Sequence, residues 1–516
     1  MPLNRDDALA NIGWGAVTVD GFIPPAAFME FQAYKVLVIA ADIRQLEHIE
    51  YTSAPDIIHE SAGHAPIISD TDYNQYLSYL GFIGTKAIFS SKDFELYETI
   101  RQLSILKEMP GIDEAIIKKT EATIFEQQQN LGEPSEMALL SRLQWWTVEY
   151  GLIGPLDQPK IYGAGLLSSI GESASCMRPE VKKIPYTIDA LTYSYDITKQ
   201  QPQLFVTPTF QNLIDVLKQF ESTMAYRVGG LESVLKAIEC KNICTAVFSS
   251  GLQVSGVFSK VATDVHHAIK YINTMGPTSL AFKDQLIQGH DVHYHAHGFG
   301  SPVGKLKDAT KSLEDYTAAD LLLAGIIIDK VVALNFENGI MVEGKLVSQT
   351  YMEEKLVLLS FADCKVTDKE GQVFFEPAWG MFDMAIGDNI VSVFNGSADK
   401  NTLEDQLYVS EQSTHQPSYT AKDLQYQSLF KQIRTYREQG KSDDSLNQIW
   451  QAIKNEFETD WLGAMELLEL ADTMPSEQAL ANELRTYLNA QSVTYPAYSK
   501  LIRDGLKIID AKLKFE

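Results

Sequence analysis

Residues 55–66 read Pro55-Asp56-Ile57-Ile58-His59-Glu60-Ser61-Ala62-Gly63-His64-Ala65-Pro66 and place two histidines and an acid within six positions. Neutral imidazole is the commonest protein ligand for transition metals, so His59 and His64 are candidate metal ligands. Zinc hydrolases with the motif His-Glu-x-x-His space their histidines four apart, on one face of a helix. Here the spacing is five, which leaves the two side chains about 140° apart around an unbroken α-helix.

One ion can reach both histidines if the helix ends between them. Gly63 is the residue type that ends helices, and Pro66 cannot continue one. We therefore predict a helix that begins near Pro55, carries His59 on its last turns and breaks at Gly63, with His64 just beyond. On this motif alone, two interpretations remain open: a metal site, or two ordinary polar residues at a helix end.

The composition is typical of a soluble globular protein. Of 516 residues, 45% are hydrophobic and 22% are charged, as in soluble multidomain chains. The net charge of −25 argues against nucleic acid and against an anionic membrane as partners. The N-terminus does not resemble a signal peptide and no apolar run is long enough to span a membrane, so we expect a cytoplasmic protein. Four cysteines without a Cys-x-x-Cys pair indicate neither a disulfide framework nor a thiolate zinc site.

The first half of the chain has a mostly helical pattern. Pro24 and Pro25 suit the first turn of a helix, which we expect to run from Ala26 to about His48. Residues 72–130 follow as charged amphipathic helices, and a further helix is expected from Ser135 to Tyr150. Arg44 is either a solvated cation at a helix end or a clamp for an anion.

Glu149 lies among aromatic residues, with no lysine or arginine near it in the sequence. Burying such a carboxylate is costly unless a cation meets it, and a metal ion would serve. The alternative is a surface acid at the end of a helix that Gly151 terminates. The run of small residues from Tyr162 to Glu172 lets the backbone pack closely against a neighbour, but it lacks the features of a phosphate-binding loop.

The pattern of the second half of the chain, taken with the helical first half, predicts an α+β multidomain protein. We expect a mixed α/β region at 231–325 with a helix near Val265 to Thr274, a β-rich module at 326–415 and a helical tail at 416–516. Asn338-Gly339 is a hairpin-turn signal within the β-rich module. Four histidines crowd one glycine-bounded stretch, and three of them share a face if it forms a strand; a polar loop is the interpretation we favour over a second metal site. They are His290, His293, His295 and His297.

Three ordered stretches carry a family resemblance: residues 55–66, the run Thr147-Val148-Glu149-Tyr150-Gly151-Leu152, and the run Tyr162-Gly163-Ala164-Gly165-Leu166-Leu167-Ser168-Ser169. They resemble the tetrahydrobiopterin-dependent aromatic amino acid hydroxylases, in particular the bacterial phenylalanine 4-monooxygenase type, here with a long C-terminal extension. The likeness covers roughly residues 12–230. It implies a mostly helical catalytic domain at 1–230, N-terminally incomplete, with a helical insertion at about 90–130.

The resemblance implies a role for each matching residue. His59, His64 and Glu149 match the two histidines and one carboxylate that hold non-haem iron(II) in this family. Residues matching the pterin site are Phe22, Ile23, Phe28 and Glu60, with Glu60 and Glu172 as the acids near the reacting groups. Residues matching the amino acid pocket are Arg44, Thr52, Trp145, Gly165 and Ser168, of which Arg44 grips the substrate carboxylate.

The implied reaction uses iron(II), a tetrahydropterin and O2 to hydroxylate the ring of an aromatic amino acid. Trp145 and the apolar Ile197 favour L-phenylalanine, which becomes L-tyrosine, with tryptophan or tyrosine as alternative substrates. Implied partners are the amino acid, O2 and reduced pterin. For the C-terminal region, which the resemblance does not cover, we expect a role in homo-oligomer formation.

Two alternatives come from other classes of protein. One is a zinc metallohydrolase that uses Glu60 as its base, which the five-residue spacing and Glu149 argue against. The other is a non-enzymatic interaction protein, which the intact set of ligands argues against.

Overall fold

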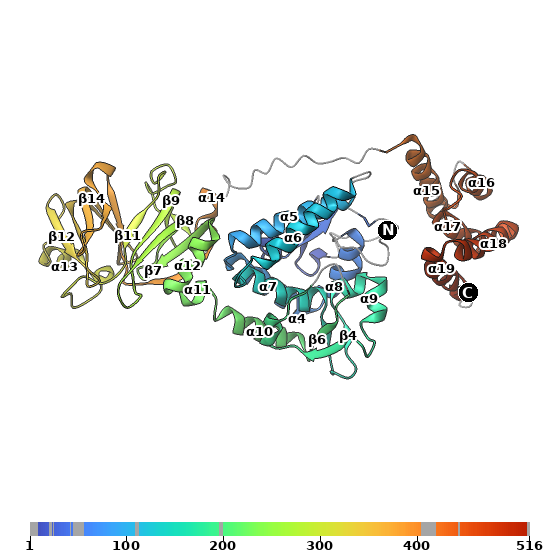
Figure 1. The fold of residues 1–516 in the computed structure, drawn as a ribbon, viewed down its shortest axis with the longest axis horizontal. Coiled ribbons are helices and arrows are strands. Elements are labelled where there is room, and N and C mark those ends of the chain that lie inside the picture. The colour runs from blue at the N-terminus through green and yellow to red at the C-terminus, as the bar shows by residue number, and fades with distance from the viewer. Residues whose placement is uncertain are drawn as a thin grey trace. The chain divides into compact units, whose positions relative to one another are not determined.

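The computed structural model describes residues 9–19, 23, 25–41, 43–44, 56–108, 113–195, 200–403, 419–441 and 444–512. The chain forms two compact units, residues 1–414 and 415–516 (Figure 1). Helices and strands are mixed, as the predicted fold class requires. Among the described helices, none has the length and apolar character needed to cross a membrane. All four cysteines are free and buried.

The chain begins with a strand, a helix and a second strand. The strands β1 (Gly15–Val19) and β2 (Val36–Ala40) pair in parallel around α2 (Pro25–Ala33). The helix begins at Pro25 as predicted, but its expected extension to His48 is wrong. Lys35 adopts the left-handed conformation with φ 59°, which turns the chain out of the helix. The run of valine, leucine and isoleucine that follows then forms β2, since such side chains suit a half-buried strand.

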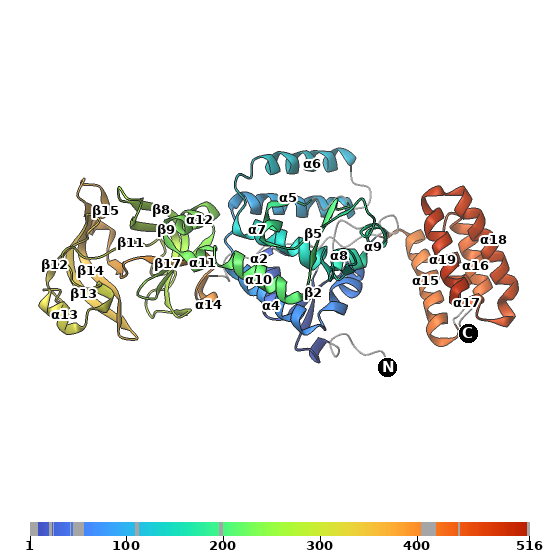
Figure 2. The ribbon, with the colours of Figure 1, turned by 90° about the horizontal axis from the view of Figure 1, so that it is seen from below.

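Helices form most of the next segment, as the sequence predicts. They are α4 (Thr71–Lys86), α5 (Ser91–Glu108), α6 (Glu114–Gln129) and α7 (Glu136–Gln144). Asp70 caps α4 by accepting N–H groups from Asp72 and Tyr73. The two charged helices α5 and α6 contact each other along their length (Figure 2).

A small four-stranded sheet follows, in the order β4-β3-β6-β5. Both β3 and β5 run parallel to β6, and β4 is antiparallel to β3. Helices α8 to α11 connect and flank this sheet, whose first strand begins just after Glu149 and Gly151. The bounds are β3 (Leu152–Ile153), β4 (Lys160–Ile161), α8 (Ala164–Ser168), α9 (Ile170–Ser175), β5 (Lys182–Pro185), β6 (Gln203–Thr207), α10 (Phe210–Glu221) and α11 (Ala225–Val228).

Two antiparallel sheets form the rest of the first unit. The first has the order β10-β9-β8-β7-β17, with β11 also paired to β9, and α12 (Gly230–Cys240) packs on it. The helix predicted near Val265 to Thr274 is wrong, because those residues belong to the long hairpin of β8 and β9. The strands are β7 (Ile243–Phe248), β8 (Leu252–Thr263), β9 (Ile269–Phe282), β10 (Gln285–Leu286), β11 (Gly300–Pro302) and β17 (Ile390–Asn395).

The second sheet has the order β12-β13-β14-β15, with β16 also paired to β14. Gly339, with φ 88°, lies in the turn between β12 and β13, so the Asn338-Gly339 hairpin is confirmed. The pairing of β17 with β7 joins the two predicted segments 231–325 and 326–415 in one sheet. The bounds are α13 (Ala318–Leu323), β12 (Val331–Asn335), β13 (Ile340–Met352), β14 (Lys355–Asp368), β15 (Val373–Phe375), β16 (Phe382–Ala385) and α14 (Lys400–Leu403).

The second unit consists of helices with a core of their own. Thr420 and Ser445 form capping boxes at the starts of α15 and α16. Five fully buried apolar side chains, one from each helix, lie at its centre: Ile433, Trp450, Leu468, Leu484 and Ile502. The helices are α15 (Ala421–Gln439), α16 (Leu446–Glu456), α17 (Leu462–Ala471), α18 (Gln478–Thr494) and α19 (Ser499–Lys512).

Candidate metal centre

The two histidines lie on one continuous helix that widens between them. The π-helical turn η2 (His59–His64) leads directly into α3 (Ala65–Ile67), and the N–H of Ala65 donates to the carbonyl of Glu60, five residues back. A π-helix bonds residue i to i+5, so residues five apart return to nearly the same face. The predicted break at Gly63 is therefore wrong. Both histidines can still face one metal ion, because the helix is wider between them and not because it ends there.

Gly63 has a packing role in this turn. A Cβ at this position would lie 2.7 Å from the carbonyl oxygen of Ala164, at the start of α8. The absence of a side chain thus lets η2 and α8 approach each other closely. The predicted close packing of the small-residue run is confirmed at Gly163 as well, where a Cβ would lie 2.5 Å from the carbonyl oxygen of Glu149.

Glu149 ends a second π-helical turn. This turn, η3 (Trp145–Glu149), continues α7, and the N–H of Tyr150 donates to the carbonyl of Trp145 at 2.9 Å. The buried hydroxyl of Thr147 lies 2.7 Å from that of Tyr76 and so ties η3 to α4. Single π turns inside α-helices occur frequently at functional sites. Both segments that carry candidate ligands have one.

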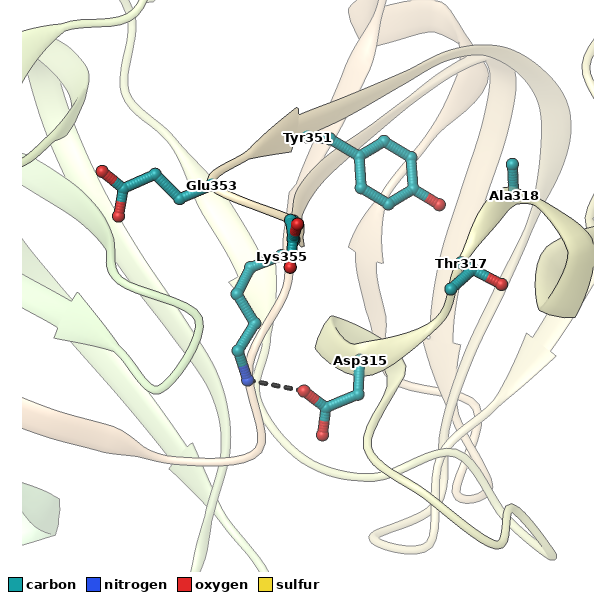
Figure 3. A pocket seen from close by; sticks show the side chains of 7 residues that line it. Asp315, Thr317, Ala318, Tyr351, Glu353 and Lys355 are labelled. Carbon is teal, nitrogen blue, oxygen red and sulfur yellow. Dashed lines mark hydrogen bonds and ion pairs between the residues drawn. The ribbon is translucent and has the colours of Figure 1, made fainter.

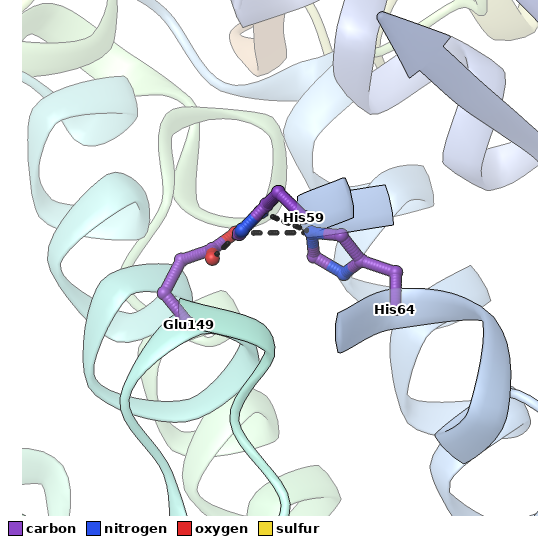
Figure 4. Close-up of side chains that lie close together, drawn as sticks. All are labelled: His59, His64 and Glu149. Atoms are coloured by element: carbon purple, nitrogen blue, oxygen red, sulfur yellow. Dashed lines mark hydrogen bonds and ion pairs between the residues drawn. The ribbon is translucent and has the colours of Figure 1, made fainter. Parts of the chain in front are cut away.

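The side chains of His59, His64 and Glu149 converge on one point (Figure 4). The two imidazole Nε2 atoms are 3.0 Å apart. The carboxylate oxygens of Glu149 lie 3.3 Å from Nε2 of His59 and 3.4 Å from Nε2 of His64. Two donors that each lie about 2.1 Å from one ion are about 3.0 Å apart at right angles and about 3.4 Å apart in a tetrahedron. All three donors can therefore reach a single metal ion.

Ser168 selects the tautomer of His59 that a metal requires. Its hydroxyl donates to the carbonyl of Ala164 at 2.8 Å and lies 2.9 Å from Nδ1 of His59. Since the hydroxyl proton is already used, Nδ1 of His59 must be the donor in this contact. The Nε2 lone pair of the neutral ring then faces His64 and Glu149, and such an outer hydrogen bond is typical of metal-bound histidines.

The charges around this cluster favour a cation. Burial alone would raise the pKa of Glu149, but the imidazoles of His64 and His59 outweigh it and hold that pKa well below its usual range. Burial alone would lower the pKa of His64, but the carboxylates of Glu149 and Glu60 raise it to about 9. The residues thus fit a bound metal: where no ion is bound, the cluster takes up a proton as its positive charge.

Arg44 is held by Asp56, a residue for which the sequence predicted no role. The carboxylate of Asp56 accepts Nε and Nη2 of Arg44 at 2.9 and 2.8 Å, and Nη1 donates to the carbonyl of Ser168 at 3.0 Å. Asp56 also accepts the backbone N–H of His59 at 2.8 Å. Burial opposes ionisation, yet the bonds from Arg44 and His59 hold the pKa of Asp56 below its usual value. Its place three residues before His59, at a helix start, was the available sequence signal.

Aromatic rings and a second buried acid adjoin the metal ligands. Trp145 stacks on Tyr195 with ring centroids 4.4 Å apart and on Tyr150 at 4.7 Å. The hydroxyl of Tyr150 donates to Glu172 at 2.8 Å. Burial raises the pKa of Glu172, and it also raises the pKa of Glu60.

The remaining predicted site residues are only partly placed by the structure. Ile23 and Phe28 are half-buried, and a Cβ on Gly165 would lie 3.0 Å from the carbonyl of Glu149. Phe22, Thr52 and Ile197 lie outside the described residues. Their roles and those of Ile23, Phe28 and Gly165 stay predictions.

A pocket of about 630 Å³ lies in the second half of the first unit, and no predicted site residue lines it (Figure 3). Its lysine, Lys355, lies 2.5 Å from Asp315 and 3.2 Å from Glu314. Because two carboxylates already neutralise this cation, the pocket has no free positive charge for an anionic ligand.

The histidine-rich stretch folds differently from its predicted strand face. His293 and His297 are exposed, whereas His295 is buried and lies beside His290 and Asp383. The stretch is a loop, which is the interpretation we favoured. It brings His290 and His295 together, whereas a strand would have placed His293, His295 and His297 on one face.

Sequence comparison relates the first part of the chain to one family. A sequence model of the biopterin-dependent aromatic amino acid hydroxylases matches residues 9–99 and 126–267. Phenylalanine-4-hydroxylase of Dictyostelium discoideum is 28% identical over 209 residues, covering 40% of this chain and 37% of that protein. The Pseudomonas aeruginosa enzyme of the same name is 26% identical over 211 residues, covering 41% and 63%. The chain thus spans less than two thirds of either relative.

A solved structure of Chromobacterium violaceum phenylalanine hydroxylase with bound oxidized Fe(III) aligns at 24% identity and a TM-score of 0.31, covering 42% of this chain and 65% of that one. The gap between the two matched stretches, residues 100–125, falls within α5 and α6. By its matched sequence, the N-terminal part of this chain is similar to the biopterin-dependent aromatic amino acid hydroxylase family.

Proposed function

We propose that the N-terminal part of this chain is an iron(II)- and tetrahydropterin-dependent monooxygenase that converts L-phenylalanine to L-tyrosine. The observation that carries this proposal is the convergence of His59, His64 and Glu149, with donor atoms 3.0 to 3.4 Å apart. Two imidazoles and one carboxylate on one side of an ion leave its other positions open, which is the ligand set of non-haem iron(II) oxygenases. The match to the hydroxylase family model and the relatives named phenylalanine-4-hydroxylase support the choice of reaction.

When bound, iron(II) and the reduced pterin together supply the activation of O2, and the protein supplies position and shielding. His59 is oriented for its task by Ser168, and His64 and Glu149 are held by buried segments of the core. Because the ligands sit on helices instead of loops, their geometry is set before any ion binds.

Arg44 is the proposed clamp for the substrate carboxylate. Of the five N–H donors of a guanidinium, three are used by Asp56 and Ser168 among the described residues. Two donors remain for a carboxylate, and the bidentate pair with Asp56 fixes the plane in which they lie. The same Ser168 contacts both Arg44 and His59, so the clamp and the metal ligand are positioned together.

The aromatic ring of the substrate is proposed to lie near Trp145, whose indole stacks on Tyr195. Glu60 and Glu172 are proposed to contact the pterin. Burial raises the pKa of both acids, which favours the protonated form more than at a surface acid.

The test is product formation by the purified full-length chain with iron(II), a tetrahydropterin, O2 and one amino acid at a time. We expect tyrosine from phenylalanine, with slower or no hydroxylation of tryptophan and tyrosine, and no product from His59→Ala. Hydroxylation of tryptophan alone would support the proposed reaction but contradict phenylalanine as the substrate. Absence of any hydroxylated product from iron-loaded protein would overturn the proposed function.

A further inference from the structure

A second cluster of metal-binding side chains lies in the part of the chain that the hydroxylase family does not match. His290 and His295 belong to the loop between β10 and β11, and Asp383 belongs to β16 in the other sheet. Nδ1 of His290 lies 3.2 Å from Nε2 of His295. One ligand atom from each of the three residues lies within 4.8 Å of the others.

The loop holds His295 firmly in place. Its backbone N–H donates to the carbonyl of Asp291 at 3.1 Å, and its carbonyl accepts the N–H of Thr278 on β9 at 3.2 Å. The ring packs edge-on against Phe299 at 5.4 Å, and the half-exposed ring of Tyr294 covers the histidine pair from outside. The two imidazoles are therefore oriented by the fold of the loop.

Asp383 is a buried carboxylate without a balancing charge. It is 5% exposed, and one of its oxygens accepts the hydroxyl of Ser360 at 2.5 Å. Within the described part of the chain, no lysine or arginine pairs with it. Burying an unpaired carboxylate is costly unless a cation meets it.

The two histidines can offer lone pairs to such a cation. Nδ1 of His290 and Nε2 of His295 lie 3.2 Å apart, and a neutral imidazole has one ring nitrogen that can act as a metal ligand. Two neutral imidazoles and one carboxylate form a donor set suited to Zn²⁺ and to similar divalent transition ions.

We propose that His290, His295 and Asp383 bind one divalent transition-metal ion, of the Zn²⁺ class, which fastens the loop between β10 and β11 to β16. Two donors on opposite sides of such an ion are about 4.2 Å apart, so small side-chain rotations close the cluster on it. Such an ion bridges the two antiparallel sheets, because its ligands come from the β10–β11 loop and from β16. This site is independent of the proposed hydroxylase chemistry.

The experiment measures Zn²⁺ and Co²⁺ binding by the full-length chain after removal of metal with a chelator. The double variant His59→Ala/His64→Ala removes the first centre. We expect it to bind one Zn²⁺ per chain and to give the visible absorption of protein-bound Co²⁺. His290→Gln and Asp383→Asn in this background should each weaken binding at least 100-fold.

The exposed histidines of the same loop provide the matched controls. His293→Ala and His297→Ala should leave the affinity unchanged. In the wild-type chain we expect two Zn²⁺ per chain, falling to one in His290→Gln, with circular dichroism confirming that the variant is folded. Two results would each overturn the site: binding of only one Zn²⁺ by the wild type, or a loss of binding in His293→Ala and His297→Ala as large as that in His290→Gln. The histidine pair would then be a hydrogen-bonded contact without a metal.

Discussion

Ser168 contacts both the candidate metal ligand His59 and the proposed substrate clamp Arg44. Its hydroxyl holds Nδ1 of His59 at 2.9 Å, and its carbonyl accepts Nη1 of Arg44 at 3.0 Å. Asp56 makes a second link, because it binds the guanidinium of Arg44 and caps the helix that carries His59. At the scale of residues, the candidate metal ligands are positioned by partners outside the cluster itself.

Replacing Ser168 by alanine should weaken metal binding. The hydroxyl accepts the Nδ1 proton of His59, and loss of such an outer partner costs about 10- to 100-fold in metal affinity. We expect a loss in that range by competition with a chromophoric chelator. Ser173→Ala is the matched control, since among the described residues its hydroxyl bonds only to the carbonyl of Ile170. An affinity equal in the two variants would show that Ser168 does not orient His59.

Asp56→Asn should destabilise the first unit by about 3 to 5 kcal/mol, the cost of leaving a buried partner unpaired. The side chains of Arg44 and Asp56 are each 3% exposed. Asparagine still caps a helix, so the loss reports on the ion pair. In urea unfolding, the control Asp70→Asn, at the exposed start of α4, should cost less than about 1 kcal/mol. Equal losses in both variants would contradict the importance of the pair.

The two π turns are the elements that build the centre. The sequence predicts the three residues that converge there, because the residue types and their motifs are local. It does not predict the widened turns, since Gly63 has the local features of a helix end and its real constraint is contact with Ala164, about one hundred residues away. The strand β2 was missed for a related reason: an apolar run such as Val36–Ala40 fits a buried helix and a strand equally well.

Gly63→Ala should separate η2 from α8. The added Cβ would lie within 3 Å of three atoms of Ala164. Overpacking of this kind costs about 1 to 3 kcal/mol, and the displaced turn should also bind less metal. Gly15→Ala is the control, because its Cβ meets only Val36 at 4.0 Å. Unfolding and metal content that match between the two variants would show that the close approach is dispensable.

At the scale of the whole molecule, the chain joins a hydroxylase-like part, two antiparallel sheets and a helical unit. Sequence patterns indicate a β-rich module with a hairpin turn at Asn338-Gly339, but they do not predict the start of β9, where a helix was expected. They also do not predict the pairing of β17 with β7, which links residues about 150 positions apart. His295 and Asp383, which lie close together in the fold, are also far apart in the sequence. Long-range contacts of this kind leave no local periodicity, so only the folded chain shows them.

The helical unit should fold without the rest of the chain. Residues 415–516 form a compact unit with fully buried side chains such as Trp450 and Leu468. We expect the isolated segment to be helical by circular dichroism and to unfold in one cooperative transition. The complementary segment 1–414 should keep the metal affinity of the full chain. A non-cooperative, largely unfolded 415–516 segment would contradict this division.

Iron binding tests the convergence of His59, His64 and Glu149 most directly. Iron per chain is measured after anaerobic loading in the His295→Ala background, so that the second cluster does not contribute. We expect one iron(II) per chain, and less than about one tenth of that in the additional variants His59→Ala and Glu149→Ala, both folded by circular dichroism. Iron content that either substitution leaves unchanged would contradict this ligand set.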